Sequence, residues 1–454
     1  MTEMALEMLQ DSSSSHAANI LIAQYAAKLG DLEQAAKLSD ALAAAHPLLP
    51  VNGIVSKAFA APGAADAKFL LVFLRGGYDA ANIVIPIGSD FYYESRPTIA
   101  LPRPDANNPD AALSLAKPND AALWGLHPAL KDTVLPLWKK NQLAFVPFAG
   151  TTDLTRSHFE TQDSIEGGMP VAPPGAAPRS YGSGFLNRLA GALDSNGAPV
   201  SFTDGLPVVM SGDVVVPNVS LKGTGRAPFD DRQMNVLAGM YAGTRFEPLI
   251  AEGFNLRRTV AEQAEMMAKG DAGAGMSAEM IAANRNAITA KGFELEARRM
   301  AGLMKDKFNV GFIDVGGWDT HVNQGNAQGQ LANLITSLGQ GLAGFAEQMG
   351  PAWKNTVVVV LSEFGRTFRE NGTKGTDHGH GSVHWVLGGS VSGGRMAGEQ
   401  VNVTAASLNQ NRDLPVLTEY RAMLSGIFKR MYGLDQTRLE RIFPSTQALD
   451  IGLL

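Results

Sequence analysis

Continuous apolar runs alternate with amphipathic segments along most of the chain. An unbroken apolar run is typical of a strand that is buried on both faces of a parallel sheet. Residues 69–74 form such a run, and further strands are predicted at residues 143–148, 310–314, 356–361 and 384–387. Apolar residues recur at helical spacing in residues 128–140, 157–165, 328–348, 416–432 and 436–442. The alternation predicts an α/β fold with a doubly wound, mostly parallel sheet and helices on both faces.

The pattern changes at two places, which sets the expected domain boundaries. Residues 1–65 carry one or two amphipathic segments followed by prolines, and we expect an N-terminal helical leader or appendage there. Residues 66–454 form the main α/β domain. Within it, residues 226–307 have a strongly helical pattern, which indicates a helical insertion. Short β-like segments precede the insertion at residues 200–202, 206–210 and 214–216.

Composition narrows the classes of function. The 454 residues suffice for a large core, and the 45% hydrophobic content is ordinary for a globular protein. A net charge of −6 without any basic run gives no reason to expect a nucleic acid partner. The chain has no cysteine, which excludes disulfides, thiolate zinc sites and cysteine nucleophiles. No apolar run approaches the ~20 residues of a membrane span.

Carboxylates follow two of the predicted strands. Asp79 comes shortly after residues 69–74, and Glu363 comes directly after the β-branched run 356–361. Ligands of open α/β sheets lie beyond the carboxyl ends of the strands, so both side chains are placed where metal ligands would be. An Asp after a strand also commonly caps the next turn, which is the alternative for Asp79.

Four of the eight histidines fall in residues 312–389, close to carboxylates and glycines. Asp319 and His321 are separated by one residue, as are His378 and His380, and residues i and i+2 of an extended segment point to the same side. Histidine and carboxylate are zinc ligands, whereas magnesium and calcium prefer oxygens. We therefore expect a divalent metal site with one or two ions, zinc first and magnesium or calcium as alternatives. A solvated loop is the alternative for each pair alone.

A hydroxyl stands at the start of the helix predicted from residue 157. The positive end of a helix dipole favours an anionic group, so Ser157 is a candidate nucleophile and Arg156 a candidate anion ligand. His158 is a candidate ligand, acid/base or buried polar residue, and an ordinary N-cap is the alternative for Ser157. Arg366, three residues after Glu363, is a second candidate for orienting an anion.

Five motifs together resemble the bacterial DUF1501 family, which belongs to the alkaline phosphatase/sulfatase-like superfamily. The motifs are Leu74-Arg75-Gly76-Gly77-Tyr78-Asp79, Arg156-Ser157-His158-Phe159, Gly317-Trp318-Asp319-Thr320-His321, Ser362-Glu363-Phe364-Gly365-Arg366-Thr367 and Asp377-His378-Gly379-His380-Gly381. The resemblance covers about residues 66–450. It implies an alkaline phosphatase-like fold and a metal site more firmly than a substrate, since the family has no well-established activity.

By this resemblance, Asp79, Glu363 and Ser157 (or Thr155) would share one metal ion. Asp319, His321 and His380 or His378 would bind a second. The chain departs from the superfamily pattern in two places. Glu363-Phe364 stands where an Asp-His pair is usual, so that His158 or His378 would have to supply a ligand. Asp319 and His321 are also two residues apart rather than four, which makes Asp314 an alternative.

The expected function is a metal-dependent hydrolase of small phosphate or sulfate esters. The alternative is a non-catalytic metal-binding or assembly protein on the same scaffold. A metal-free serine hydrolase ranks last because no Gly-x-Ser-x-Gly motif frames Ser157. The resemblance implies a periplasmic or secreted protein, although no twin-arginine signal is visible. Ala58-Phe59-Ala60 has the small-x-small form of a cleavage site, and the cytoplasm stays an alternative.

Overall fold

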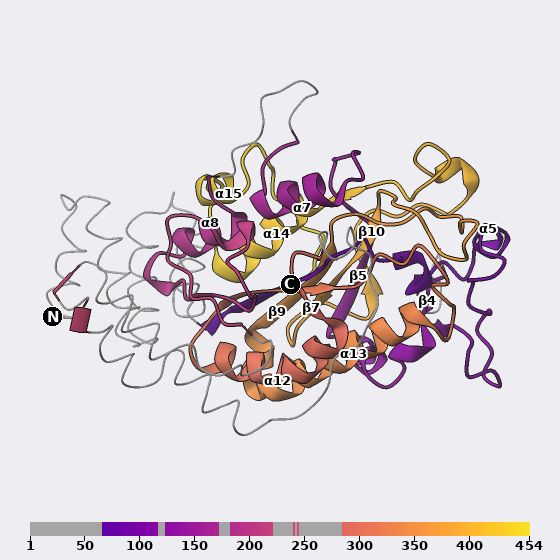
Figure 1. Cartoon of the computed structure of the whole chain (residues 1–454), viewed down its shortest axis with the longest axis horizontal. Coiled ribbons are helices and arrows are strands. Elements are labelled where there is room, and N and C mark those ends of the chain that lie inside the picture. Colours follow the sequence, from indigo (N-terminus) through magenta and orange to yellow (C-terminus); the bar gives the residue numbers. More distant parts are fainter. Residues whose placement is uncertain (1–65, 117–122, 172–181, 221–238, 241–242, 245–283) are drawn as a thin grey trace, which may run out of the picture.

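A mixed sheet runs through the middle of the molecule (Figure 1). The computed structural model describes residues 66–116, 123–171, 182–220, 239–240, 243–244 and 284–454. Within these residues the sheet has nine strands, seven of them in the order β11-β5-β10-β9-β1-β8-β6, while β12 pairs with β5 and β7 with β8. The long strands are β1 (Lys68–Leu74), β5 (Leu143–Gly150), β8 (Val310–Gly316), β9 (Thr356–Ser362) and β10 (Ser382–Leu387). The short ones are β6 (Pro199–Ser201), β7 (Ile288–Thr289), β11 (Arg395–Met396) and β12 (Thr418–Glu419).

Strand direction decides which loops meet. Strand β1 pairs in parallel with β8 and β9, whereas β10 runs antiparallel to both of its neighbours, β9 and β5. Strand β5 therefore has the same direction as β1. The segments that follow β1, β5, β8 and β9, and the segment that precedes β10, lie at one edge of the sheet. All five predicted motifs lie in or next to these segments, which fits the rule for open α/β sheets.

Helices cover both faces of the sheet, as the alternating pattern predicts (Figure 1). Strand β1 shows why: Leu70, Val72 and Leu74 join one apolar cluster, and Phe69, Leu71 and Phe73 join the other. The first face is covered by α6 (Val134–Lys139), α12 (Ala290–Asp306) and α13 (Gln330–Met349). The second face is covered by α7 (His158–Gly167), α8 (Phe185–Ala192), α14 (Tyr420–Tyr432) and α15 (Gln436–Ile442).

The long excursion after β1 forms a small annex. It contains α5 (Asp90–Ser95) and a three-stranded sheet of β2 (Val84–Ile85), β3 (Leu113–Ser114) and β4 (Gly125–Leu126). The helix expected over 128–140 is divided into a 3-10 turn at Pro128–Leu130 and α6. His127 caps that turn, since its Nδ1 accepts a hydrogen bond from the Ala129 backbone N–H (3.1 Å).

Two strand predictions are wrong. Residues 206–210 contain a 3-10 turn (Val208–Met210) rather than a strand, and residues 214–216 have no regular structure. Pro207 precedes the turn, and proline has no N–H to donate to a strand ladder. Val209 and Met210 are buried against the second face of the sheet, so apolar character there reports burial rather than strand pairing.

The predicted leader, residues 1–65, lies outside the described residues, as does most of the predicted insertion at 226–307. The described end of the insertion forms β7 and α12, which pack on β8 and α13 as parts of the main domain. Among the described helices, none is long and apolar enough to cross a membrane.

Candidate metal centre

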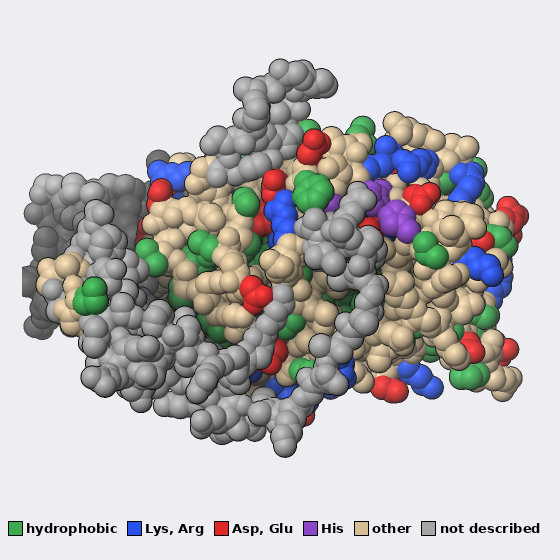
Figure 2. Space-filling model, viewed as in Figure 1, with side chains coloured by type: hydrophobic (Ala, Val, Ile, Leu, Met, Phe, Trp, Pro, Cys, Tyr) green, Lys and Arg blue, Asp and Glu red, His purple; other side chains and the backbone are tan. Residues whose placement is uncertain are grey.

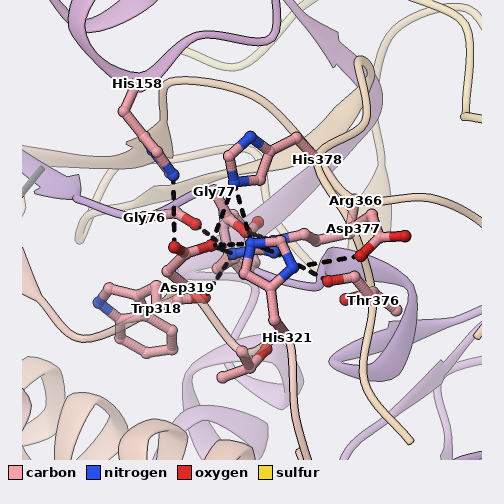
Figure 3. Close-up of polar contacts among 12 residues, drawn as sticks. Gly76, Gly77, His158, Trp318, Asp319, His321, Arg366, Thr376, Asp377 and His378 are labelled. Carbon is pink, nitrogen blue, oxygen red and sulfur yellow. Dashed lines mark hydrogen bonds and ion pairs between the residues drawn. The ribbon is translucent and has the colours of Figure 1, made fainter. Parts of the chain in front are cut away.

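Four side chains from three separate segments meet at the edge of the sheet (Figure 3). His158 begins α7, Asp319 and His321 lie in the loop after β8, and His378 lies just before β10. Ligand atoms of His158, Asp319 and His378 all lie within 4.8 Å of one another. His321 Nε2 lies 2.9 Å from Asp319 Oδ1 and 3.1 Å from His378 Nε2. The structure thus brings three histidines around one carboxylate.

Each of the three histidines is held through its Nδ1 atom by an oxygen. The partner of His158 Nδ1 is Glu363 Oε1 (2.8 Å), and that of His378 Nδ1 is the Arg156 carbonyl oxygen (3.0 Å). His321 Nδ1 lies 3.2 Å from Asp377 Oδ1. Because these oxygens accept hydrogen bonds from an Nδ1–H, each contact fixes the orientation of its ring and directs Nε2 toward Asp319. Supporting oxygens of this kind orient metal-binding histidines.

The donor set fits a zinc-type ion. Three imidazole nitrogens and one carboxylate oxygen are ligands that zinc takes in tetrahedral sites. His158 Nε2 is buried without a hydrogen bond, and Asp319 Oδ2 lies 3.5 Å from it. A cation bound between this nitrogen and the carboxylate would supply the partner that the nitrogen has no hydrogen bond to provide.

The centre is open to solvent on one side. The exposed fraction of the side chain rises from 7% at His158 to 26% at His378 and 35% at His321. Figure 2 shows histidine side chains together on the surface of the viewed face. A ligand could therefore reach the centre past His321 and His378, while His158 forms its inner wall.

Charges around the centre favour a cation. Burial alone would lower the pKa of His158, but Asp319 and Glu363 outweigh it and raise that pKa to about 9. Burial would raise the pKa of Glu363, but its bonds to His158 and Gln162 lower that pKa to about 2. The histidines hold the pKa of Asp319 far below its usual range, against the opposing effect of burial. A metal ion at His158 Nε2 would therefore take the place of a proton.

Glu363 is a supporting residue in this structure rather than a side chain facing the centre. Besides His158, its Oε1 accepts hydrogen bonds from the Gly76 backbone N–H (2.7 Å) and from Gln162 Nε2 (2.9 Å). Ser362 Oγ donates to Oε2 (2.8 Å). Gly76 has a φ of 125°, and a Cβ there would lie 2.6 Å from the Asp319 backbone nitrogen. Glycine thus lets the loop after β1 approach both carboxylates.

Three candidate ligands lie apart from the cluster. Asp79 is fully buried and accepts two hydrogen bonds from Arg96 (2.6 and 3.0 Å) and one from Gln324 (2.6 Å). Asp314 accepts from Arg75 Nε (2.6 Å) inside the sheet layer. His380 is buried outside the four-residue cluster, and burial lowers its pKa to about 4, with the Arg156 charge adding to the effect.

The predicted catalytic residues have distinct positions. Ser157 is the half-buried N-cap residue of α7, and its side chain makes no capping hydrogen bond. Arg156 is bound to Asp413 Oδ2 (2.7 Å) and has a φ of 54°. This left-handed backbone directs its carbonyl oxygen to His378. Arg366 is buried and contacts Asp319 together with the carbonyl oxygens of Gly76 and Gly77. The Arg366 side chain is therefore buried against the centre, whereas the Arg156 side chain is partly exposed and is held by Asp413.

The sequence did not reveal the side chains that hold the residues of the centre in place. Asp377 holds His321, Gln162 holds Glu363, and Asp413 holds Arg156. Gln162 could have been found, since it lies four residues after His158 and hence on the same face of the helix. Asp413 could not, because it lies 257 residues from its partner, Arg156.

Comparison with known proteins gives a family but no activity. No curated protein sequence matches the chain. A structure described as Ps i-CgsB in complex with k-i-k-neocarrahexaose is 10% identical, with a TM-score of 0.33 over 82% of this chain and 73% of that one. A structure described as BT1596, a 2-O GAG sulfatase, is 11% identical, with a TM-score of 0.26 over 84% and 73%. The profile described as "Protein of unknown function (DUF1501)" matches residues 66–443, and the chain therefore belongs to the DUF1501 family.

Proposed function

We propose that this protein is a metal-dependent hydrolase of small phosphate or sulfate esters, with the ion bound by His158, Asp319, His321 and His378. The observation that carries the proposal is the convergence of three Nε2 atoms on one carboxylate, each histidine being fixed at Nδ1 by an oxygen. A divalent ion here, zinc by the chemistry of the donors, would activate a hydroxyl or water and neutralise an anion.

Helix α7 supplies the second part of the proposed site. Its first residue is His158, so the N–H groups and the positive dipole end of the helix lie beside the metal ligands. Ser157 stands at the same helix end with its hydroxyl free of any capping bond. This arrangement supports Ser157 as the nucleophile and the helix terminus as the group that stabilises the ester's charged oxygens.

The proposed reaction has two steps. Ser157 Oγ attacks the phosphorus or sulfur atom and loses its proton, a seryl ester forms, and the alcohol leaves with a proton. Water then hydrolyses the seryl ester, which releases phosphate or sulfate and restores the serine. Arg366 takes part through Asp319, which it holds in place, because its own side chain is buried.

The experiment combines metal analysis with ester hydrolysis. We expect about one zinc-type ion per chain and turnover of p-nitrophenyl phosphate or p-nitrophenyl sulfate. Asp319→Asn should remove the metal, and Ser157→Ala should keep the metal but lower turnover by roughly 100-fold or more. Glu347→Gln, at an exposed position of α13, is the matched control. Absence of metal from the wild-type protein, or turnover unaffected by both active-site changes, would contradict the proposal.

A non-catalytic metal-binding protein is the second candidate, and one observation favours it. Asp79 and Glu363, which the superfamily pattern would assign to one of two ions, already have full sets of hydrogen-bonding partners. The structure therefore supports one ion rather than two. Tight metal binding without turnover of either ester would support this second function.

A further inference from the structure

Helix α7 is attached to the sheet by a polar stripe. His158, Gln162 and Glu166 are spaced by four residues, so they lie along one face of the helix, and all three are buried. The apolar contact of the helix comes from Ile165, which joins the cluster on the second face of the sheet. A helix held mainly by directed polar contacts has its rotation fixed by those contacts, and rotation decides where His158 points.

The stripe is bound to one buried arginine. Arg75, which follows β1, is 1% exposed and donates from Nη2 to Glu166 Oε1 (2.8 Å) and from Nη1 to Gln162 Oε1 (2.8 Å). Its Nε donates to Asp314 Oδ2 (2.6 Å) on β8. Gln162 Nε2 then donates to Glu363 Oε1 (2.9 Å), which is the oxygen that holds His158 Nδ1. A continuous chain of hydrogen bonds therefore leads from Arg75 to the candidate metal centre.

The chemistry of the donors fixes the direction of this chain. A guanidinium has only donors, so the amide oxygen of Gln162 must face Arg75. The amide nitrogen must then face Glu363, where it donates to the carboxylate. Glu363 in turn is held where it can accept the His158 Nδ1 proton, which leaves Nε2 of His158 directed at Asp319. In a buried, low-dielectric network each such bond stabilises the next.

We propose that Gln162 and Arg75 are positioning residues of the metal centre, which fix His158 through Glu363 without touching the ion. The inference rests on the metal site of the proposed function and extends it to residues outside the ligand set. If the two residues only stabilised α7, another substitution that destabilises the helix to the same extent would weaken metal binding to the same extent. If they position His158, cutting the chain at Gln162 would weaken metal binding beyond any effect on stability.

Two substitutions cut the chain of hydrogen bonds at Gln162. Gln162→Met keeps the length of the side chain and removes both hydrogen bonds. Gln162→Glu keeps the acceptor for Arg75, removes the donor to Glu363 and places two carboxylates together. Ile165→Ala is the matched control, because it weakens the apolar contact of the same helix and leaves the polar stripe intact.

The test measures Co²⁺ binding by the full-length protein, the visible spectrum of the bound Co²⁺ and thermal unfolding without metal. Substitution of residues that support metal ligands lowers affinity about 10- to 100-fold. We expect that loss and an altered spectrum for both Gln162 variants. Ile165→Ala should lower the melting temperature while its Co²⁺ affinity and spectrum stay those of the wild type.

Three outcomes would overturn the inference. Unchanged Co²⁺ affinity and spectrum in both Gln162 variants would show that Gln162 does not position His158. Equal losses of affinity in Ile165→Ala would show that helix stability alone matters. A wild-type protein that binds no Co²⁺ would remove the metal site and the inference together. Metal binding without ester turnover would count against the hydrolase alone, since the Co²⁺ measurements need no substrate.

Discussion

Arg366 shows how much a single buried residue can hold at this site. Its guanidinium contacts the carbonyl oxygens of Gly76 and Gly77 after β1, donates to the Thr376 carbonyl oxygen (3.0 Å) and pairs with Asp319. It therefore joins the loops that follow β1 and β8 to the segment that precedes β10. The planar fork of donors is what allows one side chain to satisfy oxygens in several directions, and lysine has no such fork.

Arg366→Lys should consequently destabilise the protein although it keeps the charge. Several buried carbonyl oxygens and Asp319 would lose their partners, and we expect the free energy of unfolding to fall by about 3 kcal/mol or more. The same change at Arg430, whose ion pair with Asp450 is exposed, should cost less than about 1 kcal/mol. Urea unfolding of the two variants at pH 7 makes the comparison. Equal small losses would show that Arg366 does not hold the loops together.

At the scale of elements, the sequence predicted the sheet better than the side-chain partners. The segments that form β1, β5, β8 and β9 could be predicted because strands buried on both faces are mostly apolar. Because these strands run in the same direction, Asp319 and the loop with Gly76 and Gly77 lie at one edge of the sheet. The antiparallel course of β10 was not readable, because an apolar run does not show its direction. That course is what brings His378 to the same edge.

The arginine partners of the carboxylates could not be predicted either, and the reason is different. Asp79 pairs with Arg96, which lies in the annex 17 residues later, and Asp314 pairs with Arg75, which follows the neighbouring strand β1. A carboxylate after a strand is therefore equally compatible with an ion pair and with a metal site. Only the position of the nearest arginine decides, and that position follows from the packing of the whole domain.

The segment that carries His378 is packed backbone against backbone. A Cβ added at Gly379 would lie 2.3 Å from the Arg366 carbonyl carbon, and the Gly379 N–H donates to the Gly365 oxygen (2.8 Å). Gly379→Ala should therefore cost about 2–3 kcal/mol and displace His378, with weaker Co²⁺ binding as a result. Gly372→Ala in the same loop is the control, since no atom lies within 4 Å of its added Cβ. Identical unfolding and Co²⁺ titration curves for the two variants would rule this account out.

At the scale of the whole molecule, buried neutral histidines make the fold sensitive to acid. Burial lowers the pKa of His127 to about 4 and that of His384 to about 3, and burial with the Arg156 charge lowers that of His380 to about 4. His384 lies on β10 with both ring nitrogens buried and without hydrogen bonds. These residues lie in different layers of the fold, so protonation would strain the annex, the edge of the sheet and its interior together.

The contribution of His384 to the free energy of unfolding can be isolated by measuring unfolding at several pH values. Its folded pKa lies below the unfolded value of 6.5, so stability is full above pH 6.5 and is lost as pH falls toward 3. Between pH 6.5 and 5 this residue alone should cost about 2 kcal/mol, at 1.36 kcal/mol per unit. In that window most carboxylates are ionised in both states, and His158, with its pKa raised to about 9, stays charged in the folded state. Urea unfolding of His384→Leu should therefore show a shallower pH dependence than the wild type.

Val386→Ala, on the same face of β10, is the control. This variant should be less stable than the wild type, but its stability should depend on pH in the same way. Parallel curves of stability against pH for all three proteins would refute the assignment to His384.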